Sequence, residues 1–364
     1  MIKFLNSFKS LIKLKQVHID NNVFKLHYKV TVILLVAFSV LLTTKEYFGD
    51  PIDCDVEERK EVIDTFCWIY GTFIVKRTLN DPHLPGLGLS VNQDPEAVTR
   101  QVYYQWVCIA FCIQAVIFYL PRYLWKMWEG GRLQFLVKDL TGPVVTPDWN
   151  SAKKETLVKY VLNGKQVHNI YTVRYSFCEF LNFINVVAQI YFMDWFITGH
   201  FSVYGIAYAT YKMYRLTNPM NEVFPKITKC TYFKIGPSGT EVNRDALCIL
   251  PLNVLNEKFF LVLWYWLFIL LVLSFLSLVY RALFLFVPMF RVYLLRAQTR
   301  SLDKKKSEIV VNHITYGDFF VLYKIGKNVN PMLYRDLVGA IYDQIAGKES
   351  PFKKLSPPST FDEV

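Results

Sequence analysis

Residues Phe259 to Tyr280, FFLVLWYWLFILLVLSFLSLVY, form a run of 22 residues without a charged side chain. The hydrocarbon core of a bilayer is about 30 Å thick, so a helix needs about 20 consecutive apolar residues to cross it. The run therefore predicts a membrane-spanning helix. Three other apolar segments reach or nearly reach this length, and we predict four spans in all, at residues 26–45, 102–121, 175–197 and 259–280.

The composition of the whole chain agrees with a membrane protein. Hydrophobic residues make up 53% of the 364 residues and charged residues only 20%, whereas soluble domains carry about 25% charged residues. The high hydrophobicity also excludes a disordered chain. The sequence lacks the nucleophile-elbow, zinc-protease, P-loop and dinucleotide-binding motifs, and its six histidines show no metal-ligand spacing. We therefore expect no enzymatic activity, no cofactor and no metal site.

The charges divide the chain into alternating segments. Residues 1–29, 122–174 and 281–364 each carry a net charge of +5, whereas residues 46–101 carry −6 and residues 194–258 carry +2. Basic residues are enriched in the cytoplasmic segments of membrane proteins. We therefore predict that both termini are cytoplasmic, and the basic pI no longer supports binding to nucleic acid. The predicted segments between the spans are 1–25, 122–174 and 281–364 inside the cell, and 46–101 and 198–258 outside.

The first apolar run has two alternatives to a membrane span. A buried helix of a soluble protein is one of them, since this run is the shortest. A cleaved signal peptide is the other, but the run begins only after six lysines and no small-residue cleavage motif follows it.

Four of the seven cysteines fall in the predicted outer loops, Cys54 and Cys67 in the first and Cys230 and Cys248 in the second. Thiols on the oxidising side of a membrane form disulfides, each of which contributes about 2–4 kcal/mol. A zinc site is the alternative for four cysteines, but the gaps of 12 and 17 residues do not resemble C-x2-C pairs. The residues alone leave three disulfide pairings open.

The outer loops also carry local patterns. The stretch from Cys54 to Tyr70 has apolar residues at helical spacing, and Lys229 to Gly239 predicts a short strand that turns at Gly-Pro-Ser-Gly. Residues 318–346 again show helical spacing. The predicted fold class is an all-α membrane protein, with a four-transmembrane-helix bundle, disulfide-linked extracellular loops containing a small β element, and a helical cytoplasmic domain.

Several short runs resemble one protein family. Tyr103, Tyr104, Gln105, Trp106 and Val107 form the sequence YYQWV, which is similar to the start of the second span in innexins, the invertebrate gap-junction proteins. Further similarities, in the same order as in that family, are WEGG at 128–131, KCT at 229–231, GPSG at 236–239, CILPLN at 248–253, NEK at 256–258, GDF at 317–319, and Asn330-Pro331 with Tyr334.

The resemblance implies a large-pore channel at gap junctions of the plasma membrane. It implies that identical subunits, eight by comparison with the family, form a ring, that related innexins enter the same ring, and that rings of adjacent cells dock through the outer loops. It also implies disulfides between Cys54 and Cys248 and between Cys67 and Cys230. Connexins share the topology but have three cysteines in each outer loop, so two in each loop here argue against them.

The N-terminal segment is a candidate part of the pore. Within residues 1–14, one helical stripe carries Ile2, Leu5, Phe8 and Leu11 or Ile12. A helix lying on the inner leaflet, attracted to anionic membrane lipids, is one interpretation. The resemblance favours a funnel folded into the pore, in which the narrowest inner radius is set by Met1, Ile2, Lys3, Phe4 and Leu5.

An acidic cluster follows the first span and is a second candidate for the pore lining. Glu57, Glu61 and Asp64 belong to it, and a ring of carboxylates near a pore favours cations. A solvated loop is the plainer interpretation, and no EF-hand spacing supports calcium binding.

Polar stripes mark two of the predicted spans. A stripe at helical spacing in the third span contains Glu179, Asn182, Asn185 or Val186, and Gln189. Hydrogen bonding between helices explains such a stripe better than contact with a pore. Gln105, Cys108 and Cys112 form a similar stripe in the second span, which we predict to pack against the first.

The sequence therefore predicts a gap-junction channel subunit that passes ions and small metabolites by diffusion. The alternatives are an undocked hemichannel that releases small molecules and a four-span adhesion protein without a pore.

Overall fold

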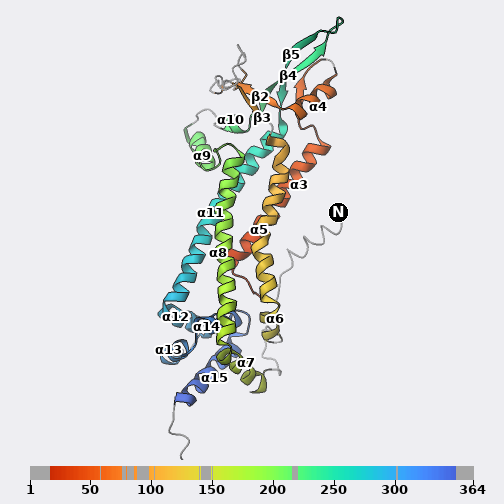
Figure 1. The fold of residues 1–364 in the computed structure, drawn as a ribbon. Helices are drawn as coiled ribbons and strands as arrows, with labels where there is room; N and C mark the ends of the chain where they lie inside the picture. Colours follow the sequence, from red (N-terminus) through yellow and green to blue (C-terminus); the bar gives the residue numbers. More distant parts are fainter. Residues whose placement is uncertain are drawn as a thin grey trace, which may run out of the picture. The chain divides into compact units, whose positions relative to one another are not determined.

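The computed structural model describes residues 17–57, 59–75, 79, 86, 87, 98–101, 103–138, 140, 149, 151–214, 220–300 and 302–349. Figure 1 shows the helices and strands of the chain, coloured along the sequence. The chain divides into two compact units. The sheet unit comprises residues 26–120 and 182–274, and the tail unit comprises residues 1–25, 121–181 and 275–364.

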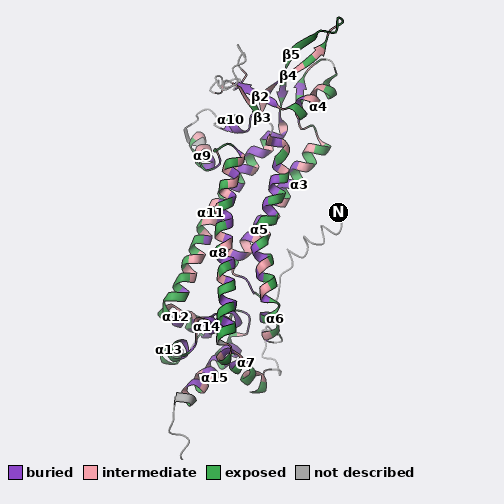
Figure 2. Cartoon of the chain, in the orientation of Figure 1, coloured by how far each residue is buried: buried purple, intermediate pink, exposed green. Residues whose placement is uncertain are grey.

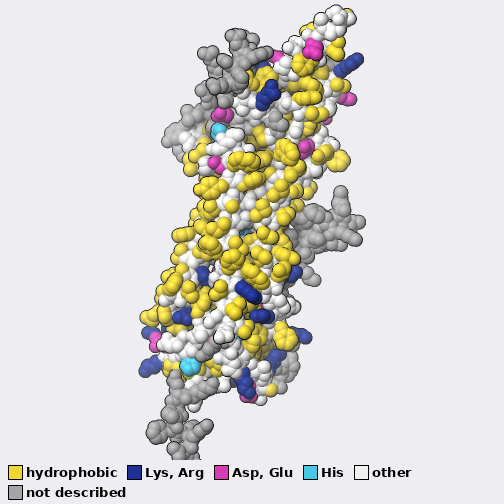
Figure 3. Space-filling model, in the orientation of Figure 1, with side chains coloured by type: hydrophobic (Ala, Val, Ile, Leu, Met, Phe, Trp, Pro, Cys, Tyr) yellow, Lys and Arg dark blue, Asp and Glu magenta, His cyan; other side chains and the backbone are white. Residues whose placement is uncertain are grey.

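Among the described residues, four helices are long and apolar enough to cross a membrane, as predicted. Less than half of each apolar stretch is buried within the chain. Hydrophobic side chains cover the outer surface of these helices (Figure 3), and Figure 2 shows exposed residues along them. The four are the helix that ends in α3 (Val32–Phe48), α5 (Val107–Glu129, preceded by the 3-10 turn Tyr103–Trp106), α8 (Lys165–Phe196) and α11 (Pro251–Phe286).

The helices are longer than the apolar runs that predicted them. Helix α5 passes through Pro121, although the sequence suggests an end there, and α8 begins ten residues before the predicted span. A proline inside a helix costs about 3 kcal/mol. Burial of Trp125, which is 0% exposed and packs against the rings of Tyr171 and Tyr175, offsets this cost one turn later.

A π-helix lies at the start of the first of these helices. The short helix α2 (Asn22–Lys25) leads into the π-helical turn Leu26–Thr31, which continues as α3. The hydroxyl of Thr31 donates to the carbonyl of Leu26, and the indole N–H of Trp266 donates to the Thr31 hydroxyl at 2.8 Å. The Thr31 hydroxyl thus provides a hydrogen-bond donor for the Leu26 carbonyl in the π-helical turn and an acceptor for the Trp266 indole.

Both predicted outer loops contribute strands to one antiparallel sheet in the sheet unit. Its order is β1-β5-β4-β2-β3, so the two strands from residues 198–258 are flanked on both sides by strands from residues 46–101. We call this sheet and helix α4 the cap. Its members are β1 (Asp53–Asp55), α4 (Lys60–Tyr70), β2 (Thr72–Val75), β3 (Val98–Gln101), β4 (Ile227–Ile235) and β5 (Glu241–Ile249).

The predicted hairpin is present and longer than expected. Strands β4 and β5 pair from Ile227 with Ile249 to Ile235 with Glu241. The N–H of Gly236 donates to the Thr240 carbonyl across the turn, where Gly239 has a φ of +75° that favours glycine.

The helix expected from Cys54 to Tyr70 is only partly correct. Residues 53–55 form β1 instead, because Cys54 pairs with Cys248 of β5, and the helix begins at Lys60. At the beginning of the stretch from Cys54 to Tyr70, strand pairing across the cap therefore decides the secondary structure in place of the helical spacing. Two helices that the sequence did not predict, α9 (Tyr204–Tyr214) and α10 (Met220–Val223), follow α8 in the sheet unit.

The core of the sheet unit is built from the four long helices and is rich in aromatic residues. Phe260 of α11 is fully buried and packs against Phe111 of α5 at 5.5 Å and against Phe224 at 4.9 Å between ring centres. Phe38 of α3 stacks on Phe259 at 4.3 Å. Aromatic pairs of this kind contribute about 0.5–1.5 kcal/mol beyond the burial of their area.

The tail unit is helical, as predicted for residues 318–346. The hydroxyl and carboxylate of Thr315 and Asp318 form a capping box at the start of α14, and His168 Nδ1 lies 2.7 Å from the Asp318 carboxylate. Burial raises the pKa of Asp318, but the hydrogen bonds from His168 and Thr315 outweigh it and lower the pKa overall. The helices of this unit are α2, α6 (Arg132–Leu136), α7 (Ser151–Asn163), α12 (Pro288–Thr299), α13 (Lys304–His313), α14 (Tyr316–Gly326) and α15 (Pro331–Glu349), together with residues 121–129 of α5, 165–181 of α8 and 275–286 of α11.

Candidate functional site

Two disulfides join the two halves of the cap. Cys54 of β1 is bonded to Cys248 of β5, and Cys67 of α4 is bonded to Cys230 of β4. These are the two bonds that the family resemblance implied. Each links residues more than 160 positions apart, 194 for the first and 163 for the second. The cap is therefore one covalently closed structure although it comes from two distant segments.

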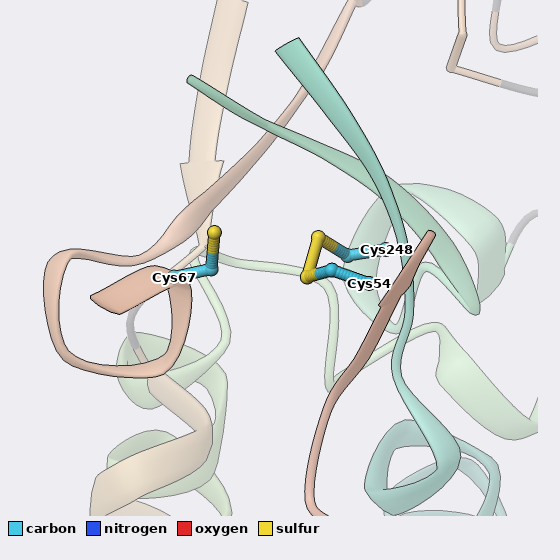
Figure 4. Close-up of side chains that lie close together, drawn as sticks. All are labelled: Cys54, Cys67 and Cys248. Atoms are coloured by element: carbon cyan, nitrogen blue, oxygen red, sulfur yellow. A yellow bond between two sulfur atoms is a disulfide. The ribbon is translucent and has the colours of Figure 1, made fainter. Parts of the chain in front are cut away.

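The sulfur atoms of the two disulfides lie close together. Those of Cys54, Cys67 and Cys248 are within 4.8 Å of one another, and Figure 4 shows the Cys54–Cys248 bond beside Cys67. A zinc site would need thiolates, whereas these sulfurs are bonded in pairs. The grouping is therefore a pair of stacked disulfides, as the sequence spacing favoured.

The disulfides lie inside a small apolar core of their own. All four half-cystines are at most 1% exposed. A core this small contributes little burial energy, so covalent links replace the packing that the cap lacks. The other residues of this core are Ile52, Ala246 and Leu250, with Val56, Ile63, Phe66, Trp68 and Tyr232 packed around them.

The acidic cluster separates into structural and exposed members. The Asp64 carboxylate accepts a hydrogen bond from the Cys54 N–H at 2.8 Å, and Lys60 pairs with Asp53 at 2.5 Å. Partial burial raises the pKa of Asp64. Glu57 and Glu61 are exposed. Asp64 thus helps to fold the cap, whereas Glu57 and Glu61 present their charge to the surroundings.

The YYQWV residues connect the cap to two of the long helices. Gln105 Nε2 and the Tyr104 hydroxyl both donate to the carbonyl of Trp68 at the end of α4, at 2.6 and 3.4 Å. The Tyr103 hydroxyl donates to Asn253 at the start of α11. The motif therefore holds α4 and α11 in position at the start of α5, where Val107 is buried and Trp106 stays 59% exposed.

The Cys108 and Cys112 stripe packs against the first long helix, as predicted. The Ser39 hydroxyl of α3 donates to the Cys108 carbonyl at 3.1 Å and lies 3.0 Å from the Cys112 sulfur. Gln105 differs, because its amide reaches Trp68 of the cap instead.

The polar stripe of α8 is buried within the chain. Asn182, Asn185 and Gln189 are at most 9% exposed in the sheet unit, and Gln189 donates to Asn185 at 3.3 Å. In the tail unit, Arg281 of α11 makes two hydrogen bonds to the Glu179 carboxylate, at 2.7 and 2.9 Å. The Glu179–Arg281 pair is thus a hydrogen-bonded contact between helices, as predicted, whereas the bond from Gln189 to Asn185 stays within α8. A carboxylate within a predicted span indicates that a basic partner lies nearby, but the sequence did not identify Arg281 as that partner.

The N-terminal candidates cannot be placed in the same way. Met1, Ile2, Lys3, Phe4 and Leu5 lie outside the described residues, which begin at Val17. Their role at the pore stays a prediction.

Comparison with known proteins extends the resemblance to almost the whole chain. The innexin family model matches residues 20–345. The chain is 46% identical to innexin inx2 of Drosophila melanogaster over 358 residues, which cover 96% of this chain and 97% of that protein. It is 47% identical to innexin inx2 of Schistocerca americana over 358 residues, 96% and 99% of the two chains. It is 40% identical to innexin shaking-B of Drosophila melanogaster over 351 residues, 93% of each chain. Since these similarities span nearly the full length and not one motif, the chain belongs to the innexin family and is a subunit of gap-junction channels.

Proposed function

We propose that copies of this chain form a ring in the plasma membrane and that the ring docks with one in an adjacent cell. Ions and small metabolites then diffuse through the joined pore, and selectivity comes from its width and wall charge. By analogy with the family, the ring has eight subunits, and related innexins enter it. Membrane lipids surround the remaining apolar surface of the four long helices.

The proposed topology places both termini and residues 122–174 in the cytoplasm. The net charge of +5 in each of these three segments supports this orientation. The disulfides support it independently, because all four half-cystines come from the two segments placed outside. An epitope tag at either terminus should be inaccessible from the medium in intact cells.

The covalently closed cap is the observation that carries the docking proposal. A surface that meets its counterpart on another cell must keep its shape without support from the membrane, and two disulfides and a five-stranded sheet supply this rigidity. The hairpin of β4 and β5 presents exposed apolar side chains near its turn, namely Phe233, Ile235 and Val242. We assign the contact with the opposing ring to this hairpin.

A charge placed on the hairpin should prevent docking. Ile235 is 73% exposed, so Ile235→Lys leaves the fold of a single chain intact but brings unpaired like charges together when two rings meet. We expect junctional conductance between paired cells to fall at least about tenfold, with single-cell hemichannel current unchanged. Met332→Lys on α15, where the side chain is 74% exposed, is the matched control. If the Ile235→Lys variant coupled cells normally, the hairpin would not be part of the docking surface.

The exposed acidic residues should influence ion selectivity. Glu57→Gln combined with Glu61→Gln removes two carboxylates per subunit while leaving Asp64 to hold Cys54. If these carboxylates line the path, the reversal potential in a salt gradient shifts away from the cation equilibrium potential. Glu155→Gln, an exposed carboxylate of α7, serves as the control. An unchanged reversal potential in the double variant contradicts a role in permeation.

Paired-cell recording also separates the alternative functions. Junctional current supports the docked channel, single-cell current without coupling supports a hemichannel that releases small molecules, and adhesion without either current supports a structural protein. The deletion of Met1 to Leu5 tests the N-terminal funnel, because an unchanged unitary conductance and dye passage would exclude it.

A further inference from the structure

The described chain begins with a segment that is held residue by residue within the tail unit. The segment is His18 to Asn21. The side chain of Asn328, just beyond the end of α14, pairs with both backbone groups of His18. The His18 N–H donates to Asn328 Oδ1 at 2.5 Å, and Asn328 Nδ2 donates to the His18 carbonyl at 3.0 Å. This pairing recognises the backbone and does not depend on the histidine side chain.

The next residue is held by a buried lysine of α14. Lys324 Nζ donates to the carbonyl of Ile19 at 3.0 Å. Lys324 is 4% exposed, and its Nζ lies 4.3 Å from the ring centre of Tyr175 and 5.3 Å from that of Phe320. A lysine is rarely buried to this extent without a specific partner. Here the partner is the backbone of the N-terminal segment.

The last two residues of the segment are held by the long helices. Asp20 forms an ion pair with Arg122 of α5, and both side chains are 3% exposed. The Asn21 N–H donates to the Tyr175 hydroxyl of α8 at 3.0 Å, and the Asn21 side chain donates to Ser277 of α11 at 3.3 Å. Irregular segments usually lie solvated on the surface. The polar contacts and burial of this one therefore indicate a fixed position.

Only Val17 separates this segment from residues 1–16. Whatever direction those residues take, their chain must leave from the point where His18 is bound. We propose that Asn328 and Lys324 are positioning residues for the pore, which use α14 of the C-terminal region to fix the root of the N-terminal arm and so set the inner width of the channel. This inference rests on the proposed function, in which Met1 to Leu5 line the pore.

The charge state of Lys324 gives the docked segment a pH dependence. Burial, with a smaller contribution from the neighbouring charge of Arg281, lowers the pKa of Lys324 to about 7, although Glu179 opposes the shift. When the segment is released, Lys324 regains water and its pKa returns toward about 10.4. Docking therefore releases a proton, weakens as the pH falls from about 10 to about 7, and changes no further below that. The charged and titratable groups around Lys324 are Arg281 of α11, Glu179 and Tyr175 of α8, Arg122 of α5, Lys327 of α14 and Asp20 of the segment itself.

Hydrogen exchange of the purified full-length protein tests the docking directly. Asn328→Leu removes both bonds to His18, so we expect amide exchange in residues 18–21 to become about tenfold faster, with protection in α15 retained. Asn312→Leu makes the same change at an exposed position of α13 and should leave exchange unaltered.

In the unmodified protein, the protection factor of residues 18–21, which is the exchange rate of an unprotected peptide divided by that of the protein, should fall as the pH is lowered from 8 to 7. In Lys324→Met, this protection factor should no longer depend on pH. Should Asn328→Leu lose protection in α15 as well, Lys324→Met carries the test alone.

Channel recordings decide whether the docking positions the pore. With residues 18–21 released, we expect an altered unitary conductance and dye-size limit, at normal surface expression. If Asn328→Leu exchanges faster in residues 18–21 but keeps its conductance and dye-size limit, the inference is overturned. Unchanged exchange in this variant overturns it as well. The deletion of Met1 to Leu5 distinguishes the two levels. If the deletion alters the pore while Asn328→Leu does not, only the positioning role fails; if the deletion alters nothing, the pore-lining role of the arm fails first.

Discussion

Channels in which Cys54 and Cys248 are both replaced by serine should carry no junctional current in paired cells. The Cys67–Cys230 bond stays in place in this variant, so the loop that the Cys54–Cys248 bond closes contains about 30 residues, and in the chain-entropy description such a link stabilises the folded state by about 4 kcal/mol. This is a large share of the stability of a small domain, about 5–15 kcal/mol. The apolar core of the cap is small, so it cannot compensate, and β1 should detach from β5. The Cys67→Ser and Cys230→Ser pair should have the same effect for α4.

The free cysteines provide a matched control for this experiment. Cys112 is exposed and not disulfide-bonded, so Cys112→Ser should couple cells normally. Surface biotinylation separates loss of docking from loss of delivery to the membrane. External reducing agent should lower the coupling of the unmodified protein and have no further effect on the serine variants. Coupling of the double-serine variant at the level of the unmodified protein would refute the structural role of the bond.

Removing one partner of the Glu179–Arg281 pair should strongly destabilise the tail unit. The two side chains are 5% and 11% exposed, and the Arg281 guanidinium lies 5.0 Å from the Tyr175 ring and 4.9 Å from the Phe320 ring. Breaking a buried ion pair costs about 3–5 kcal/mol, because the remaining charge stays buried without compensation. Glu179→Gln should therefore lower the melting temperature of the detergent-purified protein by several degrees.

A double-mutant cycle separates the lost pair from lost packing. Replacement of both residues by apolar side chains, Glu179→Leu with Arg281→Met, should restore much of the melting temperature, because no unpaired charge remains. The exposed pair of Glu155 and Lys159 on α7 is the control, and Glu155→Gln should change the melting temperature little, since water screens such pairs. Equal melting temperatures for Glu179→Gln and Glu155→Gln would show that the buried pair contributes nothing to stability.

Apolar length and turn chemistry predicted the elements of this fold well. The uncharged run at 259–280 fixes α11, and Gly-Pro-Ser-Gly fixes the hairpin turn, because both signals act within one element. The resemblance to innexins, and not the spacing of the residues, supplied the two disulfide pairings. Residues 53–55 show the limit of local pattern, since their helical spacing was overruled by pairing with a strand almost 200 residues later.

The contacts between distant segments were less predictable. Nothing in the sequence near Glu179 identifies Arg281 as its partner, because the two are brought together only when α8 and α11 pack. The role of Asn328 was missed for a related reason. Its side chain binds the backbone of His18. Every residue has the same backbone groups, so no residue type in the sequence indicates such a contact.

The interleaving of the cap has a consequence for chimeric innexins and for their evolution. The hairpin of residues 227–249 sits between strands that come from residues 53–55 and 72–75, and each of its two outer edges is paired with one of them. Grafting only one of the two segments of the cap from a relative would thus bring together strand edges that were selected in different proteins. Partner preference should transfer between innexins only when both segments are exchanged together, and substitutions along the shared edges should arise as compensating pairs.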